Sequence, residues 1–362
     1  MKLLHCLNSP HIGGIERLVI ELAIEQKSQG LDVTVMLDTK KGQYYAYLQE
    51  QNIPILDSGI KGGFDFSIYT YKKLLKCFNA YQIIHIHSFS SIRSFAALSS
   101  NSKIIYTIHG LSKGVRKDFF FKSFFRESLK SYFFNRADFL IANSGYTLIL
   151  AKKHYSLKNV KSSVILNGIQ LPQNNNKQSE ISDVFTIGLV SRFTNRKRID
   201  RLISAFIKFR LMGGIGKLVI VGDGETFTEL KEFIHSSDYH EDIDMLGYKS
   251  NVEDYYQKFH LCVFPSQNEP FGLVAVEAYL YGKLVLAFED SGGLKEVVLP
   301  IDPESIVANE DALVERLLYW SKNYNLLEEN KEKRIAYAEN HFSISRMEND
   351  YLNIYKTLVS QK

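Results

Sequence analysis

Cysteine is scarce in this chain, and its three cysteines show no paired spacing. Cys6, Cys77 and Cys262 lie far apart in the sequence, each among apolar or mixed neighbours. Isolated cysteines of this kind are typical of small buried side chains in a reducing compartment. The sequence therefore indicates neither a disulfide framework nor a cysteine-based zinc site.

Long apolar runs are also missing. No run reaches the roughly 18 residues that a membrane-spanning helix needs. The first apolar segment is short and is soon followed by Pro10 and Gly13, so it predicts a buried strand instead of a signal peptide. We therefore expect a cytoplasmic protein. A length of 362 residues, with 45% hydrophobic and 23% charged residues, indicates a globular chain of two domains.

Charge is unevenly distributed along the sequence. Residues 1–170 contain 22 basic and 11 acidic residues, whereas residues 171–362 contain 22 basic and 29 acidic ones. The net charge of +4 thus combines +11 in the first half with −7 in the second. A basic half joined to an acidic half indicates that the first half contacts something anionic.

Short apolar runs alternate with helical patterns in both halves. Helical spacing of apolar residues predicts helices over 15–29 and 343–358. The polar segment 172–183 lacks any periodicity and predicts a linker. Together these patterns predict an α/β fold with two doubly wound parallel sheets. The predicted strands are 2–7, 32–37, 83–87, 103–109 and 139–142, followed by 185–190, 217–221, 243–246, 261–264 and 284–287.

The clearest candidate site follows one of the later strands. Glu269 comes just after an apolar strand, at the edge where open parallel sheets bind ligands. The segment Phe271-Gly272-Leu273 then begins a helix whose free N–H groups can hold a phosphate. Glu277 follows eight residues after Glu269, so the two carboxylates could contact both ends of an elongated ligand. The alternative is one glutamate that stabilises a helix dipole and one that is solvated.

These motifs resemble the retaining glycosyltransferases of the GT-B fold, family four. The resemblance begins with the glutamate pair and its intervening Phe-Gly, and it covers nearly the whole chain in the family's order. The other matching segments are Gly13-Gly14-Ile15-Glu16, the histidine-bearing strand ends 83–88 and 107–110, Ala142-Asn143-Ser144, Leu166-Asn167-Gly168-Ile169, Ser191-Arg192-Phe193 with Lys197, Val221-Gly222-Asp223-Gly224, Leu246-Gly247-Tyr248, and Ser291-Gly292-Gly293 with Glu296.

The resemblance implies both an architecture and a reaction. Two Rossmann-like domains are expected to face an interdomain cleft: an acceptor-binding domain at 1–170 and a domain at 171–342 that binds the sugar nucleotide. A C-terminal helix, 343–362, is expected to pack back on the first domain. The implied reaction moves a hexosyl-type unit, with retention, from a UDP- or GDP-sugar to a saccharide hydroxyl. In that mechanism the leaving phosphate oxygen takes the acceptor proton.

The resemblance also assigns roles to residues. Arg192 and Lys197, fixed at a strand end, would stabilise the charge on the departing diphosphate in place of a divalent metal. Glu269 would contact the sugar and Glu277 the ribose. The candidate catalytic residues are His109, Arg192, Lys197 and Glu269. The candidate residues for binding the sugar nucleotide are Gly13, Gly14, Asn143, Gly222, Tyr248, Phe271, Gly272, Leu273 and Glu277.

Each of these roles has a simpler structural alternative. Lys197 could belong to a solvated basic turn, and His109 could be a hydrogen-bonded structural residue. His85 and His87 would lie on one strand face and could bind a metal with His109, but no carboxylate or cysteine completes a ligand spacing. Asp242-Ile243-Asp244 is expected to serve a turn or a cap. We therefore predict that no metal or other cofactor is required.

Residues 113–136 combine seven basic residues with eight aromatic ones. Leu129 and a few aromatics at helical spacing suffice for a core-facing stripe: Phe121, Phe125 and Tyr132/Phe133. Phe119, Phe120, Phe124 and Phe134 are then surplus. A basic helix with surplus aromatics predicts peripheral contact with an anionic membrane and a lipid-linked saccharide acceptor. The alternative is a thick core under extended basic side chains. No RNA-binding module is visible, so no nucleic acid is expected.

Two other classes of function remain as alternatives. One is a GT-B-like sugar-nucleotide epimerase or phosphorylase, and the other is a non-catalytic subunit that binds a sugar nucleotide. The absence of Gly-x-Gly-x-x-Gly after the first strand argues against a dehydrogenase. Gln170 stands where the family often has aspartate, which puts a hydrogen bond of the domain linker in doubt. The expected setting is cell-surface polysaccharide biosynthesis.

Overall fold

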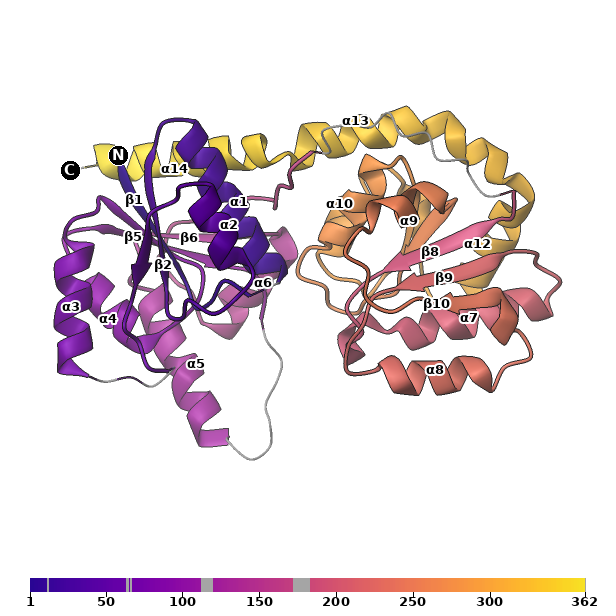
Figure 1. Cartoon of the computed structure of the whole chain (residues 1–362), viewed down its shortest axis with the longest axis horizontal. Helices are drawn as coiled ribbons and strands as arrows, with labels where there is room; N and C mark the ends of the chain where they lie inside the picture. Colours follow the sequence, from indigo (N-terminus) through magenta and orange to yellow (C-terminus); the bar gives the residue numbers. More distant parts are fainter. Residues whose placement is uncertain (12, 63–64, 66, 112–119, 172–182, 362) are drawn as a thin grey trace. The chain divides into compact units, whose positions relative to one another are not determined.

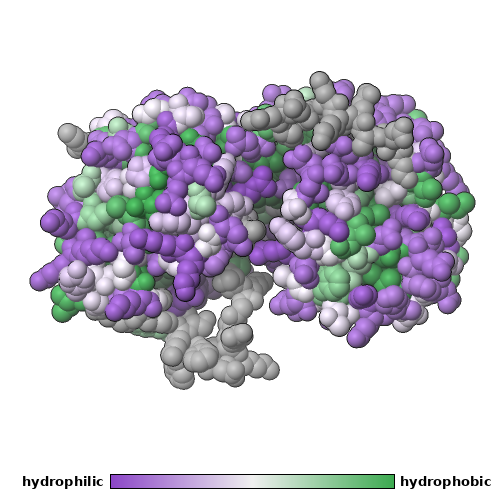
Figure 2. Space-filling model, viewed as in Figure 1, coloured by the Kyte–Doolittle hydropathy of each residue, from purple (hydrophilic) through white to green (hydrophobic). Residues whose placement is uncertain are grey.

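The computed structural model shows two compact units. The first comprises Met1–Gln170 with Ser343–Lys362, and the second comprises Leu171–Phe342 (Figure 1). The structure describes all residues except 12, 63–64, 66, 112–119, 172–182 and 362. The predicted linker and the start of the basic aromatic segment thus lie outside the described residues. On the face seen in Figure 2, hydrophilic residues predominate over both units and hydrophobic ones gather in small groups.

The first unit is built on a seven-stranded sheet in the order β3-β2-β1-β4-β5-β6-β7. Every neighbouring pair of strands is parallel. The strand order reverses between β1 and β4, which makes their carboxyl ends the switch point of the sheet. The strands are β1 (Lys2–Leu7), β2 (Asp32–Leu37), β3 (Ile55–Asp57), β4 (Ile83–Ile86), β5 (Lys103–Ile108), β6 (Phe139–Ala142) and β7 (Ser162–Val164).

Helices cover both faces of this sheet because alternate strand residues point to opposite sides. Leu3 and Leu7 of β1 join one core cluster, whereas Leu4 and Cys6 join the other. The first cluster packs under α1 (Gly14–Ser28), α2 (Tyr44–Glu50) and α14 (Ile344–Ser360). The second packs under α3 (Ile68–Phe78), α4 (Ser91–Leu98), α5 (Phe120–Phe134) and α6 (Gly145–His154).

The second unit repeats this plan with six parallel strands in the order β10-β9-β8-β11-β12-β13. Its switch point lies between β8 and β11. The strands are β8 (Thr186–Val190), β9 (Lys217–Val221), β10 (Ile243–Met245), β11 (Leu261–Phe264), β12 (Leu284–Phe288) and β13 (Ile306–Val307). The α-helices are α7 (Ile199–Leu211), α8 (Phe227–His235), α9 (Glu253–Lys258), α10 (Leu273–Leu280), α11 (Leu294–Val298), α12 (Glu310–Asn323) and α13 (Lys331–Phe342).

The C-terminal helix α14 belongs to the first unit. Met347, Tyr351 and Tyr355 are buried in the core cluster under α1. The Gly168 N–H donates to the Met347 sulfur at 3.0 Å, and a Cβ atom at Gly168 would lie 2.5 Å from the Ser343 carbonyl oxygen. A side chain at residue 168 would therefore prevent this close approach of the chain to the start of α14.

The doubly wound α/β fold predicted from the sequence is confirmed. Each predicted strand is present within one or two residues of its expected bounds. The sequence did not predict three short strands, β3, β7 and β13. Each is an outer strand of two or three residues, too short to show a periodic pattern.

The predicted core stripe of α5 was wrong in part. Phe133 and Phe134 are buried, whereas Phe125 is 51% exposed, Phe124 is 67% exposed and Tyr132 is also exposed. Phe134 packs edge-on against Tyr106 and Tyr155, so the buried face of α5 is rotated from the predicted one. The side chains of Phe119, Phe120 and Phe121 lie outside the described residues. Within the described part of the chain, no helix is long and apolar enough to cross a membrane.

Candidate functional site

The polar residues predicted in the second unit meet at its switch point. The strands β8 and β11 are direct neighbours, so the loops that follow them leave the same edge of the sheet. The Lys197 ammonium group donates to one Glu269 carboxylate oxygen at 3.0 Å. The two side chains are only 12% and 11% exposed, and the Arg196 guanidinium lies 3.8 Å from the other carboxylate oxygen. This basic turn is therefore not simply solvated.

The loop that carries Lys197 is shaped by close backbone packing. Ser191 donates its N–H to the Val221 carbonyl at 3.0 Å. Gly222 has a φ of +139°, and a Cβ atom there would lie 1.8 Å from the Ser191 carbonyl oxygen. Glycine at 222 is thus required by the fold immediately beside Arg192. A ligand contact at Gly222 remains a prediction.

The Glu269 loop is held by a second loop that follows β12. Glu269 donates its N–H to the Ser291 carbonyl at 3.0 Å and accepts from the Gly293 N–H at 2.7 Å. The two segments thereby form a parallel bridge between Glu269 and Gly292. The sequence identified both segments separately, but no pattern in it predicted that they pair.

The electrostatics of the site favour an ionised Glu269. Burial alone would raise the pKa of Glu269, but the charges of Lys197 and Arg196, the hydrogen bond from Lys197 and the charge of Arg192 together lower it below its ordinary value. Arg192 is exposed and makes no ion pair within the described part of the chain. Lys197 thus donates one of its three N–H groups to Glu269, whereas Arg192 can pair with an external anion. The contact of Lys197 with a diphosphate remains a prediction.

The helix α10 adds backbone donors and a second carboxylate. Gly272 precedes the helix at a φ of +103°, and N–H groups at the start of the helix can donate hydrogen bonds to an anion. The Phe271 ring is buried near Phe342, so Phe271 can offer only backbone atoms to a ligand. Tyr256 donates its hydroxyl to Glu277 at 3.1 Å, which orients the second glutamate. Leu273 begins the helix.

Tyr248 and the Asp-x-Asp triplet take different positions in the second unit. The Tyr248 side chain is exposed, so it can reach a ligand only from the surface. Asp242 pairs with Arg210 at 2.9 Å at the end of a short 3-10 helix. That contact explains Asp242 without a metal ion.

In the first unit, the structure brings Asn143 and His109 together. The Asn143 side chain donates to the His109 backbone carbonyl at 3.1 Å, so Asn143 ties the ends of β5 and β6. Gly13 is the N-cap of α1 and is extended. A Cβ atom at Gly14 would meet nothing within 4 Å. The described fold therefore gives no steric reason for glycine at 14, which leaves room for a ligand.

The three predicted strand-end histidines lie in one cluster with a fourth, His5, that sequence reasoning missed. The ligand nitrogens of His5, His85 and His87 all lie within 4.8 Å of one another. His87 is also hydrogen-bonded to His109 at 3.2 Å. His5 could have been found from the strand register, because His5 and His85 are direct partners in the β1–β4 pair.

Two doubly wound units of this kind define the GT-B class of fold. A solved structure with this architecture is that of Anabaena HepE in complex with UDP and glucose. It has a TM-score of 0.79 to this chain at 20% identity, over 99% of this chain and 100% of the other. At that identity the likeness shows the fold alone.

The sequence comparisons add the family. Glycosyltransferase Family 4 matches residues 12–172, and Glycosyl transferases group 1 matches residues 172–341. This chain therefore belongs to the glycosyltransferases of family 4, as the motif order predicted.

Two relatives illustrate how far the similarity extends. An uncharacterized glycosyltransferase of Methanocaldococcus jannaschii is 28% identical over 306 residues, which is 80% of this chain and 79% of the relative. The N-acetylgalactosamine-N,N'-diacetylbacillosaminyl-diphospho-undecaprenol 4-alpha-N-acetylgalactosaminyltransferase of Campylobacter jejuni is 28% identical over 180 residues, which is 49% and 48% of the two chains.

The buried ion pair predicts a change in stability. Replacing Lys197 with Met should lower the free energy of unfolding at pH 7 by about 3 kcal/mol, because the Glu269 carboxylate stays buried without its main partner. Ionised Glu269 stabilises the wild type above its ordinary pKa of 4.5, and this stabilisation is lost as pH falls below that value. In Lys197→Met the pKa of Glu269 rises, so less stability is lost on acidification and the difference in unfolding free energy between wild type and variant should narrow at low pH.

Urea unfolding between pH 4 and 8 measures both effects. Lys208→Met is the matched control, because Lys208 pairs with Asp311 at an exposed position of the same unit and should change stability by less than about 1 kcal/mol. Equal losses in the two variants would contradict the buried pair.

Proposed function

We propose that this chain is a retaining glycosyltransferase that moves a hexosyl-type unit from a nucleoside-diphosphate sugar to a hydroxyl of a saccharide acceptor. The observation that supports it most is the charge arrangement at the switch point of the second unit. There Arg192 is an exposed cation that makes no ion pair with any described residue, beside a buried pair of Lys197 and Glu269. We assign the sugar nucleotide to the second unit and the acceptor to the first.

The diphosphate would be held by a cation and by backbone dipoles. Arg192 offers a planar fork of donors that suits phosphate oxygens. The start of α10, at Gly272 and Leu273, offers free N–H groups. As the sugar–phosphate bond breaks, negative charge grows on the departing phosphate, and fixed positive groups stabilise that charge without a metal ion.

Carboxylates would hold the two ends of the sugar nucleotide. Glu269 is ionised and rigidly held between Lys197 and the segment 291–293, so it can accept hydrogen bonds from sugar hydroxyls. Glu277, oriented by Tyr256, would accept hydrogen bonds from the ribose hydroxyls. An ionised carboxylate can only accept hydrogen bonds, and sugar and ribose hydroxyls can donate them.

Retention follows if the acceptor oxygen attacks the anomeric carbon from the face that the phosphate leaves. The bond between that carbon and the phosphate oxygen breaks, and the bond to the acceptor oxygen forms. The acceptor proton passes to the leaving phosphate oxygen, which yields the nucleoside diphosphate and the glycosylated acceptor. His109 would contact the sugar at the reacting centre, and Asn143 would fix the backbone that carries it.

The relatives support a nucleotide sugar and a lipid-linked acceptor. The structure of HepE contains UDP and glucose. The Campylobacter jejuni relative is named for transfer to a diphospho-undecaprenol-linked saccharide. We therefore propose a UDP-sugar, with a GDP-sugar as the alternative, and a role in the assembly of a cell-surface polysaccharide.

The surface around α5 supports contact with an anionic membrane. Phe124 and Phe125 are exposed next to Arg126. Phe95, also exposed, packs edge-on against Phe133 of α5.

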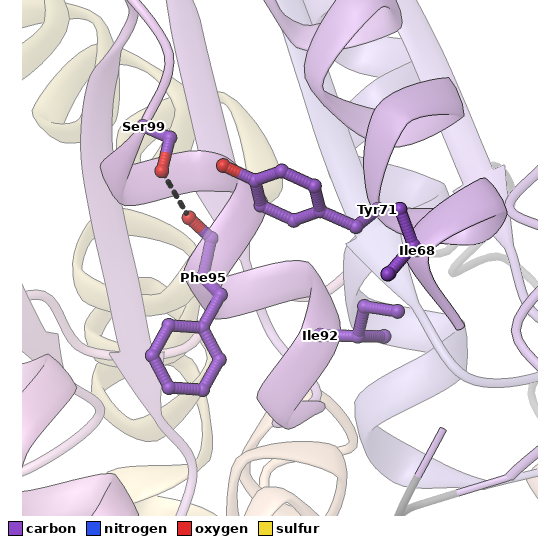
Figure 3. Close-up of a pocket in the computed structure, with 5 residues that line it drawn as sticks. All are labelled: Ile68, Tyr71, Ile92, Phe95 and Ser99. Carbon is purple, nitrogen blue, oxygen red and sulfur yellow. Dashed lines mark hydrogen bonds between the residues drawn. The ribbon is translucent and has the colours of Figure 1, made fainter. Parts of the chain in front are cut away.

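Phe95 also lines an apolar pocket between α3 and α4 (Figure 3). The other residues that line it are Ile68, Tyr71, Ile92 and Ser99. Exposed aromatics beside basic residues are the features of an interfacial surface.

Turnover with a labelled UDP-sugar tests the proposed reaction. With a lipid-linked saccharide acceptor, we expect labelled product whose new bond has the anomeric configuration of the sugar donor, measured by proton NMR. Without acceptor, the sugar nucleotide should persist apart from slow hydrolysis. Conversion of the free sugar nucleotide would instead identify an epimerase. Unaltered in vivo function in Glu269→Ala would favour a non-catalytic subunit.

Loss of the Arg192 guanidinium should weaken nucleotide binding. Arg192→Gln removes hydrogen bonds to a charged phosphate, each worth about 1.5–3 kcal/mol, so we expect UDP to bind roughly 10- to 100-fold more weakly. Isothermal titration calorimetry measures the change. Arg316→Gln is the control, because Arg316 pairs with Glu304 on the surface of the same unit. Equal affinities in wild type and Arg192→Gln would remove Arg192 from the phosphate site.

Membrane contact should depend on the exposed aromatics of α5. Replacing both Phe124 and Phe125 with Ser removes apolar area worth about 1.5 kcal/mol or more per ring when inserted. We expect at least about tenfold weaker binding to phosphatidylglycerol vesicles in a sedimentation assay. Ile149→Ser, at an exposed position of α6, should leave binding unchanged. Equal binding of the double variant and the control would contradict this surface.

A further inference from the structure

Four polar side chains form a continuous chain under α1 in the first unit. The Nε2 atom of His5 lies 2.7 Å from the Gln26 side-chain oxygen. The Nδ1 atom of His5 lies 2.8 Å from Nε2 of His87, and Nδ1 of His87 lies 3.2 Å from Nε2 of His109. Gln26, His5 and His87 are buried, whereas His109 is partly exposed at the end of β5.

The strand register explains why these rings meet. His5 and His85 are partners in the pairing of β1 and β4, and side chains alternate along each strand. His5 and His87 therefore point to the same face as Leu3 and Leu7, toward α1. Most of that face is an apolar core, so each ring nitrogen needs a hydrogen-bond partner within it.

We infer that Gln26, His5 and His87 fix the proton of His109 on Nε2, so that Nδ1 of His109 accepts a hydrogen bond from a hydroxyl of the sugar. The part of this inference that concerns the ligand rests on the proposed function. The part that concerns the proton arrangement does not.

The positions of the protons follow from the Gln26 end of the hydrogen-bonded chain. The Gln26 oxygen can only accept, so His5 carries its proton on Nε2 and its Nδ1 is an acceptor. His87 must then donate from Nε2, which leaves its own Nδ1 as an acceptor. By the same step His109 donates from Nε2. These protons are assigned from the hydrogen-bond network, and each neutral ring allows one arrangement.

Neutral rings are what this environment favours. Burial lowers the pKa of His5 to about 4 and that of His109 to about 4. Burial, with the repulsion of the neighbouring histidines, lowers the pKa of His87 well below its usual range. At neutral pH, His109 thus carries one proton, and that proton is committed to His87.

The atom at the His109 end of this hydrogen-bonded chain indicates a ligand. Among the described residues, Nδ1 of His109 has no hydrogen-bond partner although the atom is buried. An unsatisfied buried acceptor is costly unless a ligand or water completes it. A hydroxyl can donate to this lone pair, whereas a carboxylate or a fluorine atom cannot.

A metal ion fits this cluster less well. His85 binds the Tyr355 hydroxyl at 2.6 Å and the Thr107 hydroxyl at 2.7 Å through its two nitrogens. Both nitrogens of His5 and of His87 are occupied by hydrogen bonds within the series of side chains from Gln26 to His109. A metal would have to break these short hydrogen bonds, so Gln26, His5 and His87 are better described as positioning residues for His109.

NMR of protein labelled with nitrogen-15 in histidine tests the proton arrangement without any turnover. Long-range proton–nitrogen spectra at pH 7 distinguish a protonated ring nitrogen from a bare one, and His109→Gln identifies the His109 signals. We expect a proton on Nε2 of His109 and none on Nδ1. A proton on Nδ1, on both nitrogens, or signals of a bound zinc ion would overturn the inference.

A variant of Gln26, at the buried end of the hydrogen-bonded chain, distinguishes a positioning role from a packing role. In Gln26→Met the only fixed acceptor is gone, so both directions of the chain become possible and part of the His109 population should move its proton to Nδ1. Tyr351→Phe is the matched control: it alters a buried hydroxyl 3.3 Å from Thr107 on the same face but leaves the chain intact. A His109 signal that is unchanged in Gln26→Met would contradict the role of Gln26.

Binding of fluorinated sugar nucleotides tests the ligand. We would measure UDP-glucose, UDP-galactose and their deoxyfluoro analogues by calorimetry, because fluorine cannot donate. At one ring position the fluoro analogue should bind about tenfold more weakly to the wild type, and this loss should vanish in His109→Phe. Losses that persist in His109→Phe at every position would overturn the ligand contact alone. No binding of any nucleotide sugar would overturn the proposed function and the ligand contact, while NMR would still decide the proton arrangement.

Discussion

The burial of one carboxylate, Glu269, sets the arrangement of the candidate site in the second unit. An ionised group leaves water at a cost of several kcal/mol unless a partner compensates it, and here Lys197 does so at 3.0 Å. The pair joins the loop after β8 to the loop after β11, and the bridge from Glu269 to Gly292 adds the loop after β12. Three strand ends are thereby held in one arrangement, which is the preorganisation that a transferase needs.

The first unit uses the same topology but a different kind of polar network. Its switch point also lies between the first strand and the fourth, and the groups buried there include neutral histidine rings in addition to an ion pair of Arg93 with Asp38. Neutral groups cost less to bury than charges, provided that every nitrogen has a partner. One unit therefore presents positive charge suited to a diphosphate, and the other presents an uncharged acceptor suited to a hydroxyl.

The sequence predicted the sheets, the order of motifs and Glu269 as a candidate site residue, because strands and strand ends leave periodic and positional signals. It did not predict the ion pair of Glu269 with Lys197. It could not predict the link between Gln26 and His5, since a buried glutamine on a helix has no pattern of its own. The buried face of α5 was predicted wrongly for a similar reason. Many aromatics on one helix fit several stripes, and only the packing of Phe134 against Tyr106 and Tyr155 selects among them.

The positive charge at the switch point of the second unit is divided between Lys197, which contacts Glu269, and Arg192, which is exposed. The ammonium group of Lys197 has three donors, but its single positive charge could offset only one of the two negative charges of Glu269 and a phosphate. Because Lys197 donates to Glu269, the charge of the exposed Arg192 is available to a ligand. Arg192 in turn contributes to keeping Glu269 ionised. A bound diphosphate would weaken that contribution, so the short contact with Lys197 must hold Glu269 as an acceptor when the ligand is present.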